Sequence, residues 1–343
     1  KHIHLDVVGG IAGDMFCAAI LDTYPCYRAE LLDHLRALEI SPRPQIDAMP
    51  FNDGILQGYK FNVSVDEKAD SSRHQHPHQH RHWKDIRGFI DSAPLDAPVK
   101  QHALGIFQLL AEAEARVHGV VVDEVQFHEV GSWDSIIDIV AAAFLIHWID
   151  AESWSVSALP LGSGRVMTEH GRLPIPAPAT RHLLRGFRVV DDGLEGERIT
   201  PTGAAILKYL SPAGGVPQGI VAESGYGHGN KRFPGISNVL CLQVIELQAK
   251  LAADETLCVL ACEIDDQTPE DLANALEALR ACDGVKDVQQ FSSYGKKGRL
   301  SFSLQLLVNP PQKDTVIEHI FEQTSTLGVR WFAVQRRVLQ RSA

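Results

Sequence analysis

Hydrophobic and polar residues alternate at the start of the chain, over residues 2–8, with Ile3, Leu5 and Val7 on one face. This period of two predicts a half-buried strand. Three glycines then interrupt the pattern, and the apolar segment that follows, about 14–21, predicts a helix.

Two further segments, at about 98–118 and 135–149, have the composition of helices. The second is apolar on nearly every side, which predicts a buried helix. Residues 159–244 between these helices and the C-terminal region are rich in glycine and proline. Within this stretch, Thr200-Pro201 is typical of a helix start, with Thr200 as the cap and Pro201 at the first helical position.

The C-terminal region predicts a regular order of elements: strand 257–264, helix 269–282, strands 285–291 and 300–308, helix 313–323 and strand 329–338. This βαββαβ order is the signature of a ferredoxin-like domain. We therefore expect an α+β (mixed α/β) protein. It would have an N-terminal α/β domain, residues 1–250, and a C-terminal ferredoxin-like domain, residues 251–343.

Composition and charge narrow the class of protein. The 343 residues are 45% hydrophobic and 22% charged, as in globular proteins. The net charge of −11 disfavours a nucleic-acid partner, because such proteins depend on a basic surface. The sequence has neither an apolar run of the ~20 residues that a membrane span needs nor a signal-peptide pattern, so we expect no membrane partner. Six cysteines without a C-x-x-C pair fit a reducing cytoplasm.

Histidine is unusually frequent, with 16 in the chain. The polar stretch 71–82 has almost no apolar residue to bury, which predicts a solvated, mobile loop. Imidazole is a ligand suited to nickel, copper and zinc. We therefore expect metal collection by the five alternating histidines of this loop: His74, His76, His78, His80 and His82. The alternatives are a polar loop without a role and the remnant of an affinity tag.

Acidic residues mark the predicted buried helix. Asp134 and Asp138 are four positions apart and so lie on one face. A buried carboxylate needs a cation, a metal or strong hydrogen bonds. With His128 and Glu129 just upstream, these residues could supply metal ligands and a proton acceptor. Alternatively, Asp134 is simply an acidic residue in the first turn, where the helix dipole stabilises a negative charge.

Glycine turns suggest further sites. Asp6 ends the first strand and Asp14 begins the next helix, across a glycine turn of the kind that binds phosphate. Asp14 would repel a bare phosphate, so a metal or a cationic ring is the expected occupant. Two more glycine-rich loops, 162–171 with His170 and 225–232, fit either anion-binding nests or tight turns.

Charged residues also gather around the turns of the predicted ferredoxin-like domain. They are Asp265 and Asp266 after its first strand, Lys296, Lys297 and Arg299 in its hairpin, and Arg330 at its last strand. Carboxylates that hold a divalent ion, opposite cations that hold oxyanions, suit a bound triphosphate. An ordinary set of surface ion pairs is the alternative.

Several distinct motifs are spread over nearly the whole chain: Leu5-Asp6…Gly13-Asp14, Phe127-His128-Glu129-Val130-Gly131…Asp134…Asp138, Thr200-Pro201-Thr202-Gly203, Glu263-Ile264-Asp265-Asp266 and Lys296-Lys297-Gly298-Arg299. Together they resemble the nickel insertion proteins (LarC-type) that complete the nickel-pincer nucleotide cofactor of lactate racemase. The His-rich loop falls where that family carries one. Two features depart from the family: its chains continue past Ala343, so the C-terminal domain looks truncated, and Tyr294-Gly295 replaces a methionine.

The resemblance implies a nickel chelatase of the lyase class. It would insert Ni²⁺ into a pyridinium bisthiocarboxylate mononucleotide, assisted by CTP with Mg²⁺ or Mn²⁺, for an apo acceptor enzyme such as lactate racemase. Homo-oligomers are compatible with this function. The expected roles are a general base at His128 or Glu129, with His170 as alternative, nickel binding at Asp6, Asp14, Asp134 and Asp138, and nucleotide binding at the charged residues of the C-terminal domain.

Two other functions fit some of the same residues. A nickel storage protein or metallochaperone without chemistry would bind metal through His74 to His82 and be indifferent to CTP. A metal-dependent hydrolase would use the four aspartates and turn over phosphate or amide substrates without a thiocarboxylated nucleotide.

Overall fold

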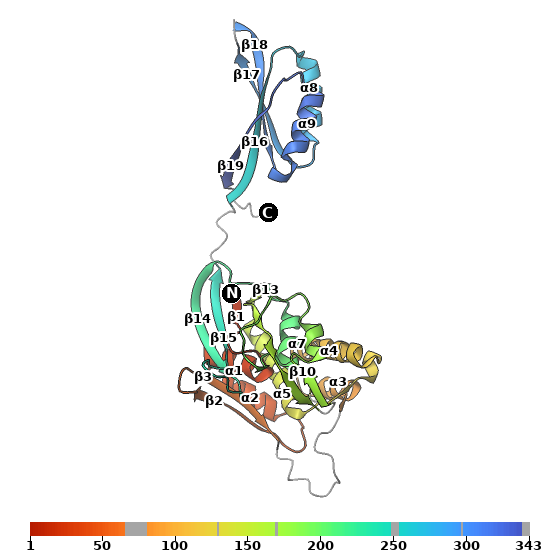
Figure 1. The fold of residues 1–343 in the computed structure, drawn as a ribbon, viewed down its shortest axis with the longest axis vertical. Helices are drawn as coiled ribbons and strands as arrows, with labels where there is room; N and C mark the ends of the chain where they lie inside the picture. Colours follow the sequence, from red (N-terminus) through yellow and green to blue (C-terminus); the bar gives the residue numbers. More distant parts are fainter. Residues whose placement is uncertain (66–80, 129, 169–170, 248–253, 296–297, 338–343) are drawn as a thin grey trace. The chain divides into compact units, whose positions relative to one another are not determined.

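The computed structural model of the chain describes residues 1–65, 81–128, 130–168, 171–247, 254–295 and 298–337. The chain forms two compact units, Lys1–Gln248 and Ala249–Ala343 (Figure 1). The first contains a seven-stranded mixed sheet and the second a four-stranded antiparallel sheet, so the expected mixed α/β class is confirmed. Within the described residues, helices of the length and apolarity needed to cross a membrane are absent.

The sheet of the first unit has the order β13-β6-β1-β15-β14-β3-β2. These strands are β13 (Ala213–Gly214), β6 (Ser153–Val156), β1 (His2–Asp6), β15 (Val239–Leu247), β14 (Gly219–His228), β3 (Gln57–Ser64) and β2 (Gln45–Asn52). β1 pairs in parallel with β6 and antiparallel with β15, which places it inside the sheet.

Strand β1 is buried on both faces, whereas its alternating pattern predicted a half-buried strand. The polar face is satisfied by its neighbour β6: the ring nitrogens of His2 lie 2.8 Å from Ser153 Oγ and 2.7 Å from Ser155 Oγ. His4 Nδ1 also lies 2.8 Å from Ser155 Oγ. Because hydroxyls meet these imidazoles, the polar side chains can be buried without losing hydrogen bonds.

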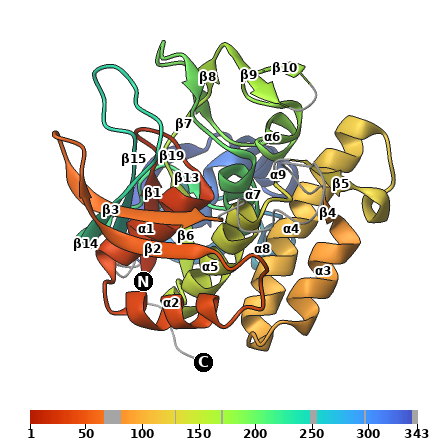
Figure 2. The same ribbon diagram turned by 90° about the horizontal axis from the view of Figure 1, so that it is seen from below.

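Helices cover this sheet and form a bundle beside it (Figure 2). They are α1 (Gly13–Thr23), α2 (Tyr27–Arg36), α3 (Trp83–Ser92), α4 (Ala97–His118), α5 (Trp133–Ile149), α6 (Pro178–Leu183) and α7 (Pro201–Leu210). Helix α1 packs on β14 and β3, and α5 packs against both α1 and α4. As expected, α5 is buried along most of its length, because its apolar residues point to several partners.

Short paired segments connect these elements. They are β4 (Arg81–His82), β5 (Gln126–Phe127), β7 (Leu159–Pro160), β8 (Gly162–Ser163), β9 (Arg165–Thr168), β10 (Gly171–Pro174), β11 (Val189–Val190) and β12 (Gly196–Glu197). The pairs are β4 with β5, β7 with β11, β8 with β12, and β9 with β10. A 3-10 helix, Val122–Glu124, precedes β5.

The loop predicted at 225–232 is wrong over its first half, because Gly225 to His228 belong to strand β14. The glycines there serve close packing. A Cβ on Gly227 would lie 2.0 Å from Met15 O, and one on Gly225 would lie 2.6 Å from Thr23 N. Helix α1 therefore approaches β14 closely only because both positions lack a side chain.

The second unit has the order β16 (Asp254–Ile264), α8 (Pro269–Arg280), β17 (Val285–Tyr294), β18 (Leu300–Val308), α9 (Lys313–Gln323) and β19 (Arg330–Arg337). This agrees with the element order expected from sequence. The sheet order is β17-β18-β16-β19, and neighbouring strands are antiparallel. Residues from β16, β18, α8 and α9 form a separate hydrophobic core, which includes Leu260, Leu304 and Ile320.

Candidate active site

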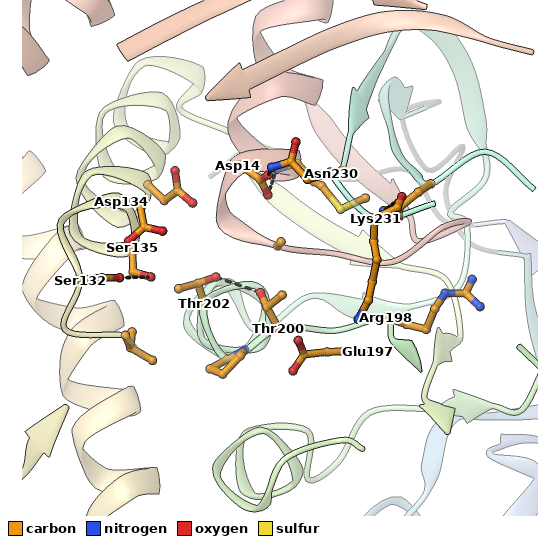
Figure 3. A pocket seen from close by; sticks show the side chains of 17 residues that line it. Asp14, Ser132, Asp134, Ser135, Glu197, Arg198, Thr200, Thr202, Asn230 and Lys231 are labelled. Atoms are coloured by element: carbon orange, nitrogen blue, oxygen red, sulfur yellow. Dashed lines mark hydrogen bonds between the residues drawn. The ribbon is translucent and has the colours of Figure 1, made fainter. Parts of the chain in front are cut away.

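The N-termini of three helices, α1, α5 and α7, meet at one pocket of the first unit (Figure 3). Its volume is about 390 Å³, within the range of small-molecule sites. It is lined by Ala12, Asp14 and Met15, by Val130, Ser132, Asp134, Ser135 and Asp138, by Glu197, Arg198, Thr200, Pro201 and Thr202, and by Gly229, Asn230, Lys231 and Asn238. Helix N-termini carry partial positive charge, so their convergence favours anionic groups here.

Hydrogen bonds tie the start of α7 to the start of α1. Thr200 Oγ1 accepts a hydrogen bond from Gly203 N at 3.2 Å, which caps α7 as the sequence predicted. Thr200 and Thr202 share a hydrogen bond of 2.9 Å between their hydroxyls, and Thr202 Oγ1 accepts from Gly13 N at 3.3 Å. A Cβ on Gly203 would lie 2.3 Å from Ile11 O, so the two helix ends are in direct contact.

Four carboxylates line the same pocket: the three aspartates Asp14, Asp134 and Asp138, and Glu197 at the end of β12. Asp14 Oδ1 accepts a hydrogen bond from Met15 N at 2.7 Å, and its Oδ2 from Asn230 Nδ2 at 3.4 Å. Burial raises the pKa of Asp14 to about 6. Burial, with repulsion from Asp14 and Asp134, raises the pKa of Asp138 well above its usual range. Burial therefore disfavours the charged forms of Asp14 and Asp138, and a bound cation would favour them.

Among the residues that the structure describes, no three His, Cys, Asp or Glu side chains are spaced to hold a metal ion. The three pocket aspartates therefore do not form a complete metal site by themselves. A metal held by them would take further ligands from a small molecule or require side-chain rotation.

Arg198 lines the pocket, but its guanidinium is bound to other groups of the protein and has a structural role. Only 2% of this residue is exposed. Its guanidinium donates to Gly9 O, to Val8 O at 2.8 Å and to Asp192 Oδ2 at 2.7 Å. The ring of Phe233 lies 4.8 Å from the guanidinium carbon. Arg198 therefore holds the glycine turn after β1 in place.

Asp6 does not line this pocket. It ends β1 opposite Cys241 of β15. Burial raises the pKa of the Cys241 thiol to about 11, and the charge of Asp6 contributes to this shift. Among the four aspartates expected to gather, the structure thus brings Asp14, Asp134 and Asp138 together and places Asp6 apart.

His128 follows β5 and lies beside α4 rather than in the lining of the pocket. Its ring centroid is 6.0 Å from that of His118, whose Nε2 lies 3.4 Å from Glu114 Oε2. Val130, two positions after His128, does line the pocket. The other candidate bases, Glu129 and His170, lie outside the described residues.

The end of the His-rich stretch is attached next to the pocket. His82 lies in β4 and is paired with Gln126 of β5. The Arg81 guanidinium donates to Gly131 O at 2.5 Å and lies 4.0 Å from the centroid of the Trp133 ring, at the first turn of α5. The four remaining histidines lie outside the described residues: His74, His76, His78 and His80.

In the second unit, the described nucleotide candidates lie at one end of the sheet. Asp265 and Asp266 follow β16, and Arg299 immediately precedes β18. Ile264 of β16 pairs with Phe302 of β18. The Arg330 guanidinium, at the start of β19, donates to Glu263 Oε1, and Asp266 accepts a hydrogen bond from the Ser325 hydroxyl. Lys296 and Lys297 lie outside the described residues.

Sequence reasoning missed part of the lining. Asn230 and Lys231 were noted only as the end of a glycine-rich loop, and Ser132 and Ser135 were not singled out at all. Thr202 was visible as part of a helix start, but its contact with Gly13 joins residues 189 positions apart. Such a contact leaves no local signal.

Comparison with known proteins identifies the family of this chain. The family described as "Nickel insertion protein" matches residues 3–343. Two proteins described as "Pyridinium-3,5-bisthiocarboxylic acid mononucleotide nickel insertion protein" are similar to this chain. The one from Akkermansia muciniphila is 38% identical over 340 residues, which cover 98% of this chain and 83% of that protein. The one from Staphylococcus epidermidis is 35% identical over 350 residues, covering 100% of this chain and 83% of that protein.

Among solved structures, a similarity of 32% identity is found to "LarC2, the C-terminal domain of a cyclometallase involved in the synthesis of the NPN cofactor of lactate racemase, apo form". It covers 26% of this chain and 60% of that one, with a TM-score of 0.25, too low to bear on the fold. The family match and the two relatives each extend over nearly the whole sequence. This chain therefore belongs to the nickel insertion protein family.

Proposed function

We propose that this protein inserts nickel into pyridinium-3,5-bisthiocarboxylic acid mononucleotide, in a CTP-dependent reaction that supplies a cofactor to a lactate racemase-type enzyme. The observation that carries the proposal is one pocket, in a chain of this family, that is lined by three aspartates and, on the wall opposite Asp134, by Lys231 and Glu197. Relatives over 98% and 100% of the chain are named for this substrate.

Nickel enters this reaction as a substrate. Asp14, Asp134 and Asp138 would hold Ni²⁺ in the pocket through carboxylate oxygens. The sulfurs of the thiocarboxylates are softer ligands and compete well for nickel. Transfer from the aspartates to the nucleotide is therefore favourable, and an incomplete set of carboxylates suits a metal that must leave.

The family resemblance implies a product with a nickel–carbon bond, and formation of that bond would require one ring C–H of the substrate to lose its proton. A general base must come within hydrogen-bond reach of that proton. His128, Glu129 and His170 are our proposed acceptors. Among them, His128 lies only two positions before Val130, which lines the pocket.

CTP would bind to the second unit, which we take to be a ferredoxin-like domain from its βαββαβ element order. Two carboxylates and two guanidinium groups at one sheet end fit a triphosphate with its divalent ion. Asp265 and Asp266 would hold Mg²⁺ or Mn²⁺. Arg299 and Arg330, with Lys296 and Lys297, would hold phosphate oxygens. When bound, CTP supplies the free energy of phosphoanhydride cleavage.

The direct test is incubation of the purified protein with Ni²⁺, CTP, Mn²⁺ and the bisthiocarboxylated mononucleotide, followed by mass spectrometry for the nickel adduct. We expect the wild-type chain and the surface control Asp91→Asn to form the adduct, and Asp138→Asn to lose it with an unchanged circular dichroism spectrum. Full adduct yield from Asp138→Asn would remove the pocket from the mechanism. Full yield without CTP would remove the nucleotide requirement.

A further inference from the structure

The wall of the pocket opposite Asp134 carries Lys231 (Figure 3). Among the described residues, two cations line this pocket, Lys231 and Arg198. The Arg198 guanidinium is occupied by Gly9 O, Val8 O and Asp192. Of these two cations, Lys231 is therefore the one whose charge is not already used to hold the turn after β1.

Lys231 is held at a defined place. Asn238 Nδ2 donates to Lys231 O at 2.8 Å, and Gly229 N donates to Asn238 O at 2.9 Å. The side chain runs along β12, because a Cβ on Gly196 would lie 3.8 Å from both Lys231 Cε and Nζ. The preceding residue, Asn230, donates to the Asp14 carboxylate. One short segment thus sets the spacing between the lysine and the acidic wall.

The two sides of the pocket differ in the charge they favour. The first turns of α1 and α5 contain Asp14 and Asp134, whereas the first turn of α7 contains no acidic residue. The partial positive charge of the α7 N-terminus is therefore not offset by a carboxylate in its own first turn. The Thr200 and Thr202 hydroxyls and the Lys231 ammonium provide donors for an anion in this part of the pocket, where Glu197 is the one carboxylate among the lining residues described. A matching ligand has a metal-binding group at one end and an anionic oxygen group at the other.

We propose that Lys231 is the positioning residue for the phosphomonoester of the mononucleotide substrate. The pairing of this phosphate with Lys231, beside the N-terminus of α7, places the pyridinium ring toward Asp14, Asp134 and Asp138. The inference deepens the proposed function and rests on it. The ammonium sets where the substrate sits and takes no part in the bond changes at nickel.

The test compares the mononucleotide with its dephosphorylated nucleoside by calorimetric titration of the full chain without nickel. We expect Lys231→Met to weaken mononucleotide binding by roughly tenfold or more, as for loss of a hydrogen bond to a charged group. Binding of the nucleoside should not change. Lys231→Arg should restore most of the affinity, and Arg232→Met, the neighbouring exposed cation, should behave as wild type. In the nickelation assay, Lys231→Met should raise KM with little change in kcat.

Two results would overturn this role. One is an equal loss of affinity for nucleotide and nucleoside in Lys231→Met, or no loss at all. The other is a loss confined to CTP in a parallel titration, which would assign Lys231 to the triphosphate. If the wild-type chain forms the nickel adduct and Lys231→Met is unaffected, only the inference falls. If the wild-type chain forms no adduct under any condition, the proposed function falls with it.

Discussion

Burial raises the pKa of two pocket aspartates, Asp14 and Asp138, in the folded chain. The pKa of Asp14 is raised to about 6, mainly by burial, from 3.8. A carboxyl whose pKa is raised on folding binds protons more tightly in the folded than in the unfolded state. Its contribution to stability is therefore lost as the pH rises from about 4 to about 6. Above about pH 6 the ionised Asp14 therefore lowers the free energy of unfolding, a loss of stability that is common at binding sites.

Asp14→Asn removes this carboxyl and its penalty. We expect the variant to be more stable than wild type at pH 7 by roughly 1–2 kcal/mol, after allowance for partial solvent exposure. The difference should shrink toward pH 4, where the wild-type carboxyl is protonated in both states. Urea unfolding at several pH values measures this, alongside loss of the nickel adduct. A variant that is less stable than wild type at pH 7 would contradict the assigned pKa shift.

For Arg198 we expect a substitution to lower the stability of the fold rather than raise it. Arg198→Met would leave the carbonyls of Val8 and Gly9 without their donor, so we expect a loss of about 3 kcal/mol in the free energy of unfolding. Arg43→Met, at an exposed position, is the matched control and should change stability by less than about 0.5 kcal/mol. If the two variants unfold at the same denaturant concentration, Arg198 does not hold the turn.

At the scale of elements, the close contact of α1 with β14 depends on glycine. Because a Cβ on Gly227 would meet the backbone oxygen of Met15 at 2.0 Å, Gly227→Ala must push α1 away from the sheet. We expect a loss of about 2–3 kcal/mol. Gly88→Ala, on the open surface of α3 with no atom within 4 Å of the new Cβ, should gain about 0.5–1 kcal/mol. Thermal unfolding of the two variants tests the pair.

The pairing of β4 with β5 connects the His-rich stretch to the first turn of α5. Deletion of 71–80, which spares this pairing, separates an insertase from a nickel store. For an insertase we expect full adduct yield when free nickel is ample and a reduced yield when nickel is limiting. A storage protein would lose its nickel binding with the stretch and be indifferent to CTP. Adduct yield and bound nickel per chain, measured at two nickel concentrations, decide between them.

At the scale of the whole molecule, each unit has its own hydrophobic core. We therefore expect residues 1–247 and 254–343 to fold when expressed separately, with unfolding transitions that match those of the full chain in calorimetry. If the proposed division of labour holds, the first fragment should bind the mononucleotide and the second should bind CTP. Failure of either fragment to unfold cooperatively would show that its core is not self-sufficient.

Short-range patterns in the sequence determined most of the elements. The apolar surface of α5, the Thr200 cap with Pro201, and the order of strands and helices after residue 254 were predicted because each depends on neighbouring residues. The same patterns also marked Asp14, Asp134 and Asp138 as candidate metal ligands, which stays a prediction.

Which of these residues come together depends on the packing of segments that are far apart in the chain. It joined the starts of α1, α5 and α7 in one pocket, kept Asp6 out of it and brought in Lys231 from the segment after β14. It also buried the polar face of β1 against β6, and it placed Gly225 to His228, predicted as a loop, in strand β14. The physical reason is that periodicity shows which face of an element is buried, whereas the partner of that face comes from strand pairing and helix packing between residues far apart in the chain.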